Sequence, residues 1–378
     1  MMIKRTFWLR VIEAYFKKRS VIWLYGPRRA GKTFLCRSIP GVEYFDCELP
    51  EIRQRITNPG FLESVSGKTI VLDEIHRIDN PSELLKIAAD YHHGTKIIAT
   101  GSSTLNAYKS FRDTLTGRKY NLRLTPMMSQ DMDDFNIKDF DKRLLNGGLP
   151  GFLAEDRDKS NYSEWMESYW AKDVMELFSI EKRHSYLKFI ELLMSNSGGI
   201  FEATSYAADC EISRHTVLTY LSAIELTGVV SIVRPYSVMK NNEIVHAPKI
   251  YGFDTGFVCY FKGWEKLRHE DYGTLWEHIV LNEFTALMQD KSVNYWRDKQ
   301  GHELDFVIPV SRGAVDVFEC KWSSKHIDVS NTKIFRNKYP AGTNYAVVYD
   351  CDKSYKTVIS GTKVTILGLK HLREAINY

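Results

Sequence analysis

The residues best suited to chemistry in this chain stand in one short loop, GPRRAGKT at positions 26–33. They fit the spacing G-x-x-x-x-G-K-[ST], and the backbone N–H groups of such a loop, at the start of a helix, can surround a phosphate. Lys32 would reach the β- and γ-phosphates of a nucleoside triphosphate, and Thr33 would hold a magnesium ion. We expect the nucleotide contacts to come from Gly26, Pro27, Arg28, Arg29, Ala30, Gly31, Lys32, Thr33 and Phe34.

Two acidic residues, Asp73 and Glu74, directly follow the apolar run TIVL at 69–72. A short strand that ends in two carboxylates is the pattern of a Walker B element, which places both acids beside the phosphate loop. Asp73 would bind magnesium through water, and Glu74 would orient or activate the attacking water. The alternative interpretation is an acidic cap at the start of the next helix.

Two further positions are candidates for the same site. Ser102 follows the strand-like run KIIAT at 96–100, where its hydroxyl could contact the γ-phosphate, although Gly-Ser-Ser is also ordinary turn chemistry. Arg118 is a candidate transition-state cation, acting within its own chain or across a subunit interface. A solvated surface arginine is the alternative for Arg118.

A parallel sheet is needed to position these residues. From the start of the chain to about residue 155, short apolar strands alternate with amphipathic helices, the pattern of a parallel sheet with crossover helices. Helical periodicity dominates from about 160 to 263, and from about 265 onward a long helix precedes a run of strands. The strands predicted for the first part cover 21–25, 42–45, 69–72, 96–100 and 120–124.

The middle part contains a predicted helix-turn-helix over residues 203–228, with Ser213 as the N-cap of a second helix at 214–226. Its expected core-facing residues are Val217, Leu218, Leu221, Ile224 and Leu226. Polar side chains near the start of a recognition helix usually make the base-edge contacts. The candidates for nucleic-acid contact are Arg214, His215, Thr216 and Thr219. A protein-interaction module or a lid on the nucleotide domain is the alternative, because phosphate contacts normally need several cations.

The third part carries two carboxylates and a lysine in a predicted hairpin, with strands at 304–310 and 314–321. Asp305 and Glu319 each lie seven residues from Arg312, so the hairpin sets them opposite one another, and Lys321 shares the face of Glu319. Such a group could bind a divalent cation and stabilise charge during phosphodiester cleavage. A cross-strand salt bridge is the alternative.

Composition bounds the partners. The net charge of +4 does not indicate nucleic-acid binding over the whole surface, although a local basic patch would be compatible with it. The six scattered cysteines lack metal-ligand spacing, which favours reduced thiols. With no apolar run of about 18 residues and no signal-peptide pattern, we expect no membrane span and a cytoplasmic location.

Six motifs occur in one order over nearly the whole chain: GPRRAGKT, VLDEIHRI, TGSS, LTGR, NGGLPGF and APKIYGFDTGF. In this they resemble bacterial and archaeal AAA-type ATPases that carry a C-terminal domain of unknown function with a restriction-endonuclease-like core. The resemblance implies an α/β chain with ATP and Mg²⁺ as ligands. Its parts would be an AAA-like P-loop domain over 1–155, a helical and winged-helix domain over 156–264, and a nuclease-like α/β domain over 265–378.

Asp305 and Glu319-Cys320-Lys321 are similar to the PD-(D/E)XK nuclease pattern, although no proline precedes Asp305. This resemblance implies a metal site completed by Glu277, with Glu283 as the second choice, and hence a second divalent metal. Two functions follow as hypotheses. One is an ATPase that couples its nucleotide state to binding or processing of DNA or RNA. The other is a nucleotide-gated switch for a protein partner, with an inactive nuclease-like domain.

Overall fold

The computed structural model of the 378-residue chain describes residues 3–101, 115–175, 178, 180, 182–237, 247–289 and 291–376. The chain forms two compact units. The first contains Met1–Phe140, Gly148–Arg183 and Thr219–Val229, and the second contains Asp141–Gly147, His184–Leu218 and Val230–Tyr378. The chain therefore passes from one unit to the other five times.

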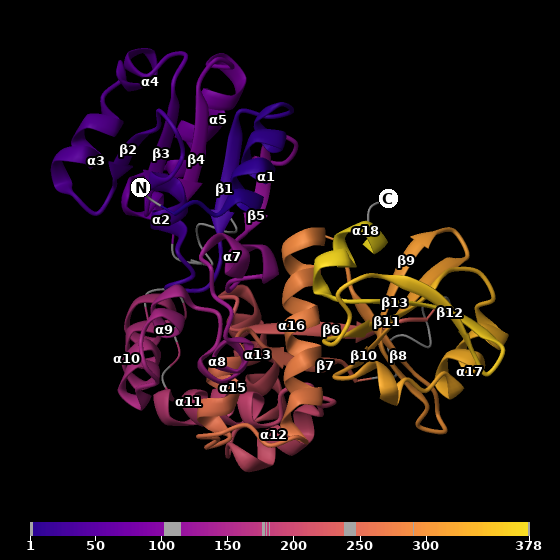
Figure 1. The fold of residues 1–378 in the computed structure, drawn as a ribbon. Helices are drawn as coiled ribbons and strands as arrows, with labels where there is room; N and C mark the ends of the chain where they lie inside the picture. Colours follow the sequence, from indigo (N-terminus) through magenta and orange to yellow (C-terminus); the bar gives the residue numbers. More distant parts are fainter. Residues whose placement is uncertain are drawn as a thin grey trace. The chain divides into compact units, whose positions relative to one another are not determined.

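The first unit is built on a five-stranded sheet in the order β2-β3-β4-β1-β5, in which every neighbouring pair is parallel (Figure 1). Strands β1, β3 and β4 are almost wholly buried, as expected when helices cover both faces of a parallel sheet. The strands are β1 (Val21–Tyr25), β2 (Glu43–Asp46), β3 (Thr69–Asp73), β4 (Lys96–Thr100) and β5 (Lys119–Arg123). Each of the five predicted strands is confirmed to within a residue at either end.

Helices of the first unit flank this sheet and complete its core. Trp23 on β1 belongs to a buried cluster that also includes Leu72 on β3 and Leu85 on α5. The helices are α1 (Thr6–Phe16), α2 (Lys32–Arg37), α3 (Pro50–Thr57), α4 (Phe61–Ser64), α5 (Pro81–Tyr91), α7 (Ser129–Asp134), α9 (Pro150–Ala154) and α10 (Lys159–Tyr169). A π-helical turn, Trp170–Val174, continues α10.

The second unit is built on an eight-stranded mixed sheet in the order β12-β13-β11-β10-β9-β8-β6-β7. Its strands are β6 (Val230–Pro235), β7 (Lys249–Gly252), β8 (Asn294–Arg297), β9 (Glu303–Ser311), β10 (Ala314–Lys321), β11 (Asn344–Val348), β12 (Tyr355–Ile359) and β13 (Thr362–Leu367). The long helix α16 (Asp271–Met288) packs on this sheet, where Phe284 meets Phe306 and Phe318 edge-on. The other helices of this part of the chain are α8 (Phe140–Asn146), α11 (Arg183–Ser195), α15 (Thr255–Phe261), α17 (Ser330–Lys338) and α18 (Leu372–Ile376).

The predicted helix-turn-helix corresponds to α12 (Ala203–Asp209) and α13 (Arg214–Leu226). Ser213 caps α13, because its hydroxyl accepts a hydrogen bond from the Thr216 N–H at 3.0 Å. The expectation that Leu218 faces the core is wrong, since this side chain is 39% exposed. Tyr220 is buried instead, next to Leu221 on the inward stripe of α13. Strand β6, which follows the helix-turn-helix, pairs with both β7 and β8 and so belongs to the eight-stranded sheet.

Parts of two sequence motifs, residues 146–147 and 254–256, pack against each other within the second unit. A Cβ atom at Gly256 would overlap the carbonyl oxygen of Asn146, and one at Gly147 would overlap the carboxylate of Asp254. Asp254 in turn caps α15 by accepting a hydrogen bond from the Gly256 N–H at 2.9 Å. The small residues of these motifs are therefore required for close backbone packing.

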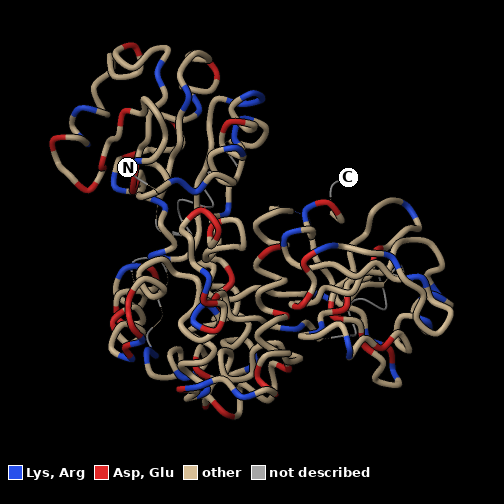
Figure 2. The backbone as a smooth tube through the Cα atoms, in the orientation of Figure 1, with Lys and Arg blue, Asp and Glu red and all other residues tan. Residues whose placement is uncertain are grey.

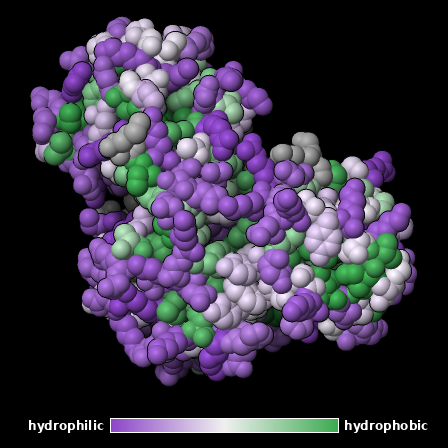
Figure 3. Space-filling model, in the orientation of Figure 1, coloured by the Kyte–Doolittle hydropathy of each residue, from purple (hydrophilic) through white to green (hydrophobic). Residues whose placement is uncertain are grey.

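The surface carries no single dominant charge. Figure 2 shows basic and acidic residues interspersed along both units, and the face drawn in Figure 3 is mainly hydrophilic with scattered hydrophobic side chains. Over the described ranges, none of the helices has the length and apolar character needed to cross a membrane. Each of the six cysteines, all of which lie in the described ranges, is a free thiol.

Candidate functional site

The loop at 26–33 owes its shape to two glycines. Gly26 has a φ of 152°, and a Cβ atom there would overlap the carbonyl oxygen of Leu124 at the end of β5. Gly31 has a φ of 94° and stands at the N-terminus of α2, so a side chain there would be strained. The buried guanidinium of Arg5 stabilises the loop by donating a hydrogen bond to the Ala30 carbonyl at 2.8 Å. The same guanidinium pairs with Asp131 at 2.5 Å.

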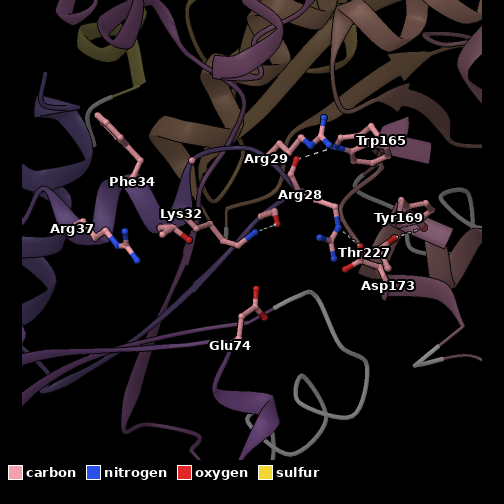
Figure 4. A pocket seen from close by; sticks show the side chains of 13 residues that line it. Arg28, Arg29, Lys32, Phe34, Arg37, Glu74, Trp165, Tyr169, Asp173 and Thr227 are labelled. Atoms are coloured by element: carbon pink, nitrogen blue, oxygen red, sulfur yellow. Dashed lines mark hydrogen bonds and ion pairs between the residues drawn. The ribbon is translucent and has the colours of Figure 1, made fainter. Parts of the chain in front are cut away.

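Lys32 lies folded over this loop. Its ammonium donates hydrogen bonds to the carbonyls of Gly26 at 3.0 Å and Pro27 at 3.3 Å (Figure 4). Burial lowers the pKa of Lys32 from its ordinary value, against the opposing effect of the Glu74 and Asp173 carboxylates. The Lys32 ammonium is partly withdrawn from water and lies at the N-terminus of α2, so it is well placed to bind a phosphate.

Asp73 is the meeting point of three hydroxyl groups. Thr33 donates to Asp73 Oδ2 at 2.9 Å, and the hydroxyls of Tyr44 and Thr100 also bond to its carboxylate. Burial and the Asp73 carboxylate both raise the pKa of the Tyr44 phenol, so this group stays a donor. Tyr44 and Thr100 were not predicted from the sequence, where their one signal is their position near the carboxyl ends of β2 and β4.

Glu74 is separated from Asp73 by a sharp turn of the backbone. Its φ of 52° and ψ of 44° are left-handed, which is uncommon for a residue with a side chain. The turn directs the carboxylate toward the space beside Lys32 (Figure 4), where His76 Nδ1 lies 3.3 Å from Glu74 Oε2. Strained residues of this kind concentrate at active sites and ligand clamps.

Gly26, Gly31, Lys32, Thr33 and Glu74 line a cavity of about 610 Å³ in the first unit. Its other walls come from residues that the sequence analysis did not select, namely Arg37, Trp165, Tyr169, Asp173 and Thr227. The Trp165 indole donates to the carbonyl oxygen of Arg28 at 3.1 Å, and the Arg28 side chain pairs with Asp173 at 2.9 Å. Helix α10 and the π-helical turn therefore form the wall opposite the glycine-rich loop.

The predicted hairpin of the second unit has the expected register. Phe306 pairs with Phe318, so the next step along the strands sets Asp305 beside Glu319, and a bulge between Ala314 and Val315 absorbs the turn. Asp305 Oδ2 accepts from the Cys320 N–H at 2.7 Å. Lys321 Nζ lies 3.4 Å from Glu319 Oε2 and 3.9 Å from Asp305 Oδ2.

Glu277 on α16 belongs to the same electrostatic cluster. Burial and the nearby Asp305 carboxylate raise the pKa of Glu277 to about 8, and Tyr251 donates a hydrogen bond to it at 3.0 Å. Burial likewise raises the pKa of Glu319. Glu283 is buried six residues further along α16 and therefore projects from another side of the helix.

Models of three protein families match consecutive parts of the chain. Residues 18–132 match a family described as "AAA domain". This part of the chain, which holds the parallel sheet of a P-loop fold, is similar to AAA domains and is called the AAA domain from here on. Residues 137–268 and 272–371 match two domains of unknown function, DUF8612 and DUF4143.

Most of the chain also has relatives among known proteins. It is 27% identical over 321 residues to uncharacterized proteins of Mycobacterium tuberculosis and Mycobacterium bovis, which covers 81% of this chain and 71% of each relative. A Walker-type ATPase of Pyrococcus abyssi is similar with a TM-score of 0.46 and 15% identity, over 69% of this chain and 96% of that one. The ORC1 protein of Aeropyrum pernix, solved in complex with DNA, is similar with a TM-score of 0.30 and 14% identity. The match covers 70% of this chain and 93% of that one.

Some of the predicted site residues do not line the cavity of the AAA domain. Arg118 pairs with Asp90 of α5 at 2.5 Å, and this hydrogen bond lowers the pKa of the Asp90 carboxyl. Ser102 lies outside the described residues. In α13, Arg214, His215 and Thr219 are exposed, whereas the backbone of Thr216 bonds to the Ser213 cap.

The two candidate metal positions differ in how well they suit a divalent ion. Beside the loop of the AAA domain, the hydroxyl of Thr33 and the carboxylate of Asp73 are oxygen donors 2.9 Å apart, which suits Mg²⁺ that keeps several waters and binds phosphate oxygens. In the hairpin cluster the Lys321 ammonium lies close to both carboxylates. Nowhere in the described ranges do three or more His, Cys, Asp or Glu side chains form a group that could hold a metal.

Proposed function

We propose that the AAA domain hydrolyses ATP in a Mg²⁺-dependent reaction. The observation that supports this most directly is the convergence of Lys32, Thr33 and Glu74 on one cavity, with Asp73 bonded to Thr33 at 2.9 Å. A cation, two oxygen donors and a further carboxylate are the groups that phosphoryl transfer to water requires.

Each residue has one task in this proposal. The N–H groups of the glycine-rich loop and Lys32 bind the β- and γ-phosphates, and Lys32 exchanges its bonds to Gly26 and Pro27 for phosphate oxygens. Thr33 and Asp73 hold Mg²⁺, which would neutralise charge on the phosphates. Glu74 orients the attacking water and accepts its proton. Tyr44 and Thr100 fix the direction of the Asp73 carboxylate by their hydrogen bonds to it.

The test measures ATP binding and phosphate release separately. We expect Lys32→Ala to lose both, whereas Glu74→Gln keeps binding and loses turnover by at least a hundredfold, because it removes the water-orienting base. Lys68→Ala, which removes an exposed lysine paired with Glu43, is the matched control and should behave as wild type. Hydrolysis at the wild-type rate in Lys32→Ala would overturn the assignment of the site.

We further propose that the nucleotide state is coupled to DNA or RNA. Support comes from the exposed Arg214, His215 and Thr219 on α13 and from the Asp305, Glu319 and Lys321 cluster. Binding of single-stranded, duplex and branched probes should weaken as salt rises and should change when ATP is added. Cleavage in Mg²⁺ or Mn²⁺ that is lost in Asp305→Ala and Lys321→Ala would assign a nuclease activity to the cluster.

The second candidate is a nucleotide-gated switch that acts on a protein partner, with a catalytically inactive nuclease-like domain. The observation that favours it is the position of the Lys321 ammonium, which lies 3.4 Å from Glu319 and 3.9 Å from Asp305. Tight ATP binding with slow turnover, and no salt-dependent affinity for any nucleic-acid probe, would decide for the switch.

A further inference from the structure

The glycine-rich loop carries a second cation, Arg28, which forms an ion pair with Asp173. Arg28 Nε lies 2.9 Å from Asp173 Oδ2, and the two side chains are 23% and 7% exposed. Both residues line the cavity that also contains Lys32 and Glu74, as Figure 4 shows. An ion pair that is this far withdrawn from water is screened only weakly by salt, so its partners strongly influence each other.

Asp173 sits on an unusual piece of backbone. It belongs to the π-helical turn Trp170–Val174 at the end of α10, and such turns are rare and frequently found at functional sites. The same run of helix also contacts the backbone of Arg28, because Trp165 donates to its carbonyl at 3.1 Å. Arg28 is thus held by its main chain and its side chain from one helical segment.

The negative charge of Asp173 is unfavourable in a cavity that is proposed to bind a triphosphate. A carboxylate that faces a triphosphate repels it, and a buried carboxylate without a partner is costly. Asp173 is tolerable beside a phosphate loop because Arg28 neutralises it. A triphosphate would present several negative oxygens to the same guanidinium, which prefers phosphate and carboxylate oxygens to water.

We infer that Arg28 exchanges Asp173 for a phosphate oxygen when a nucleoside triphosphate binds, so that Asp173 lowers the affinity of the cavity and ATP releases the π-helical turn. This inference rests on the proposed ATP site. It makes Arg28 a phosphate-binding residue, and it makes Asp173 a built-in competitor of the nucleotide. The bistable part is the Arg28 side chain with its two alternative acceptors.

The neighbouring pair offers a matched control. Arg29, also in the loop, bonds to Glu164 of α10 at 2.7 Å, but these side chains are 38% and 67% exposed. An exposed pair contributes little and is readily screened. Loss of the Glu164 charge should therefore barely change nucleotide affinity. Like the loss of the Asp173 charge, it removes a carboxylate of the same helical segment that pairs with an arginine of the glycine-rich loop.

The experiment is a double-mutant cycle on the full chain, with the affinity for a fluorescent ATP analogue measured at fixed Mg²⁺. Asp173→Asn should tighten binding by about tenfold, within the usual range of coupling between two equilibria, and Glu164→Gln by less than twofold. Arg28→Ala should weaken binding. In Arg28→Ala/Asp173→Asn the gain from Asp173→Asn should be clearly smaller than in the presence of Arg28, because only the repulsion by the carboxylate is removed and no guanidinium remains to be released.

Two results would overturn the inference while ATP binding itself stands. One is an unchanged affinity in Asp173→Asn; the other is an equal gain with and without Arg28, which would make Asp173 a simple repulsive charge. If wild type shows no ATP binding that Lys32→Ala removes, the proposed site falls and the inference with it. An independent readout is hydrogen exchange of peptides covering 170–175. ATP should speed exchange there in wild type and leave it unchanged in Asp173→Asn.

Discussion

Acid should destabilise the second unit through one buried histidine. His278 on α16 is 5% exposed, and its Nδ1 donates to the Thr274 carbonyl at 2.7 Å, since a carbonyl can only accept. Its Nε2 therefore accepts from the Ser197 hydroxyl at 2.6 Å, and Ser197 in turn accepts from the Gly252 N–H at 2.6 Å. These contacts satisfy both ring nitrogens of a neutral imidazole, and the buried ring has no acidic partner among them.

The size of the effect follows from the pKa. Burial lowers the pKa of His278 from an ordinary value of 6.5 to about 4. Below pH 6.5 His278 becomes protonated in the unfolded chain but stays neutral in the folded unit. Stability that is present above that pH is therefore lost as the pH falls toward 4. At about 1.4 kcal/mol per pKa unit, the full loss is roughly 3 kcal/mol, of which about 2 kcal/mol falls between pH 7.5 and 5.

The assay is urea unfolding of wild type and His278→Gln at pH 7.5 and 5, read by pulsed hydrogen exchange of α16 peptides so that only this unit is scored. The contributions of all other titrating groups cancel in the difference in unfolding free energy between the two proteins. This difference should shrink by about 2 kcal/mol between pH 7.5 and pH 5. His269→Gln, which replaces an exposed histidine near the start of the same helix, should show no such change. A gap for His278→Gln that is equal at both pH values would refute the reasoning.

Three further perturbations test the support of the two sites. Arg5→Ala leaves the Asp131 carboxylate buried without its cation, so urea unfolding should show a loss of about 3–5 kcal/mol in the first unit, whereas Lys17→Ala in an exposed pair with Glu13 should change nothing measurable. Gly26→Ala pushes the glycine-rich loop off β5 and should weaken ATP binding by more than tenfold in a titration, while Gly151→Ala, which has open space, should leave it intact. Lys321→Ala removes the cation beside Glu319, whose pKa burial already raises, so the unfolding midpoint of the second unit should rise relative to that of wild type as the pH is lowered from 8 to 6. A midpoint that falls relative to wild type over that range would contradict the cluster's electrostatics.

Much of the first unit could be predicted because its signals are local. Short apolar runs bounded by turn residues gave all five strands, and the spacing of the loop at 26–33 specified the strand before it and the helix after it. The hairpin register was equally accessible, since a tight turn and the two-residue period of a strand leave little freedom.

The residues that the sequence did not reveal are those that reach the site from a distance. Asp173 contacts Arg28 across 145 positions and Trp165 contacts it across 137, and no spacing rule connects such pairs. Tyr44 and Thr100 carry ordinary strand side chains, and only the order of the strands places both beside Asp73. Leu218 was misplaced because an apolar residue one step from Val217 lies about 100° away around a helix.

The five passages of the chain between its two units bear on the order in which the protein can be made. The first unit needs residues as late as Thr219–Val229, which carry Thr227 of the cavity wall, whereas the second unit already claims Asp141–Gly147. A ribosome that adds residues in order must therefore release most of the AAA domain before its cavity can close. Truncation at residue 155 would cut through the first unit and truncation at residue 264 through the second, and either cut would expose apolar surface. The chain should be expressed and refolded whole.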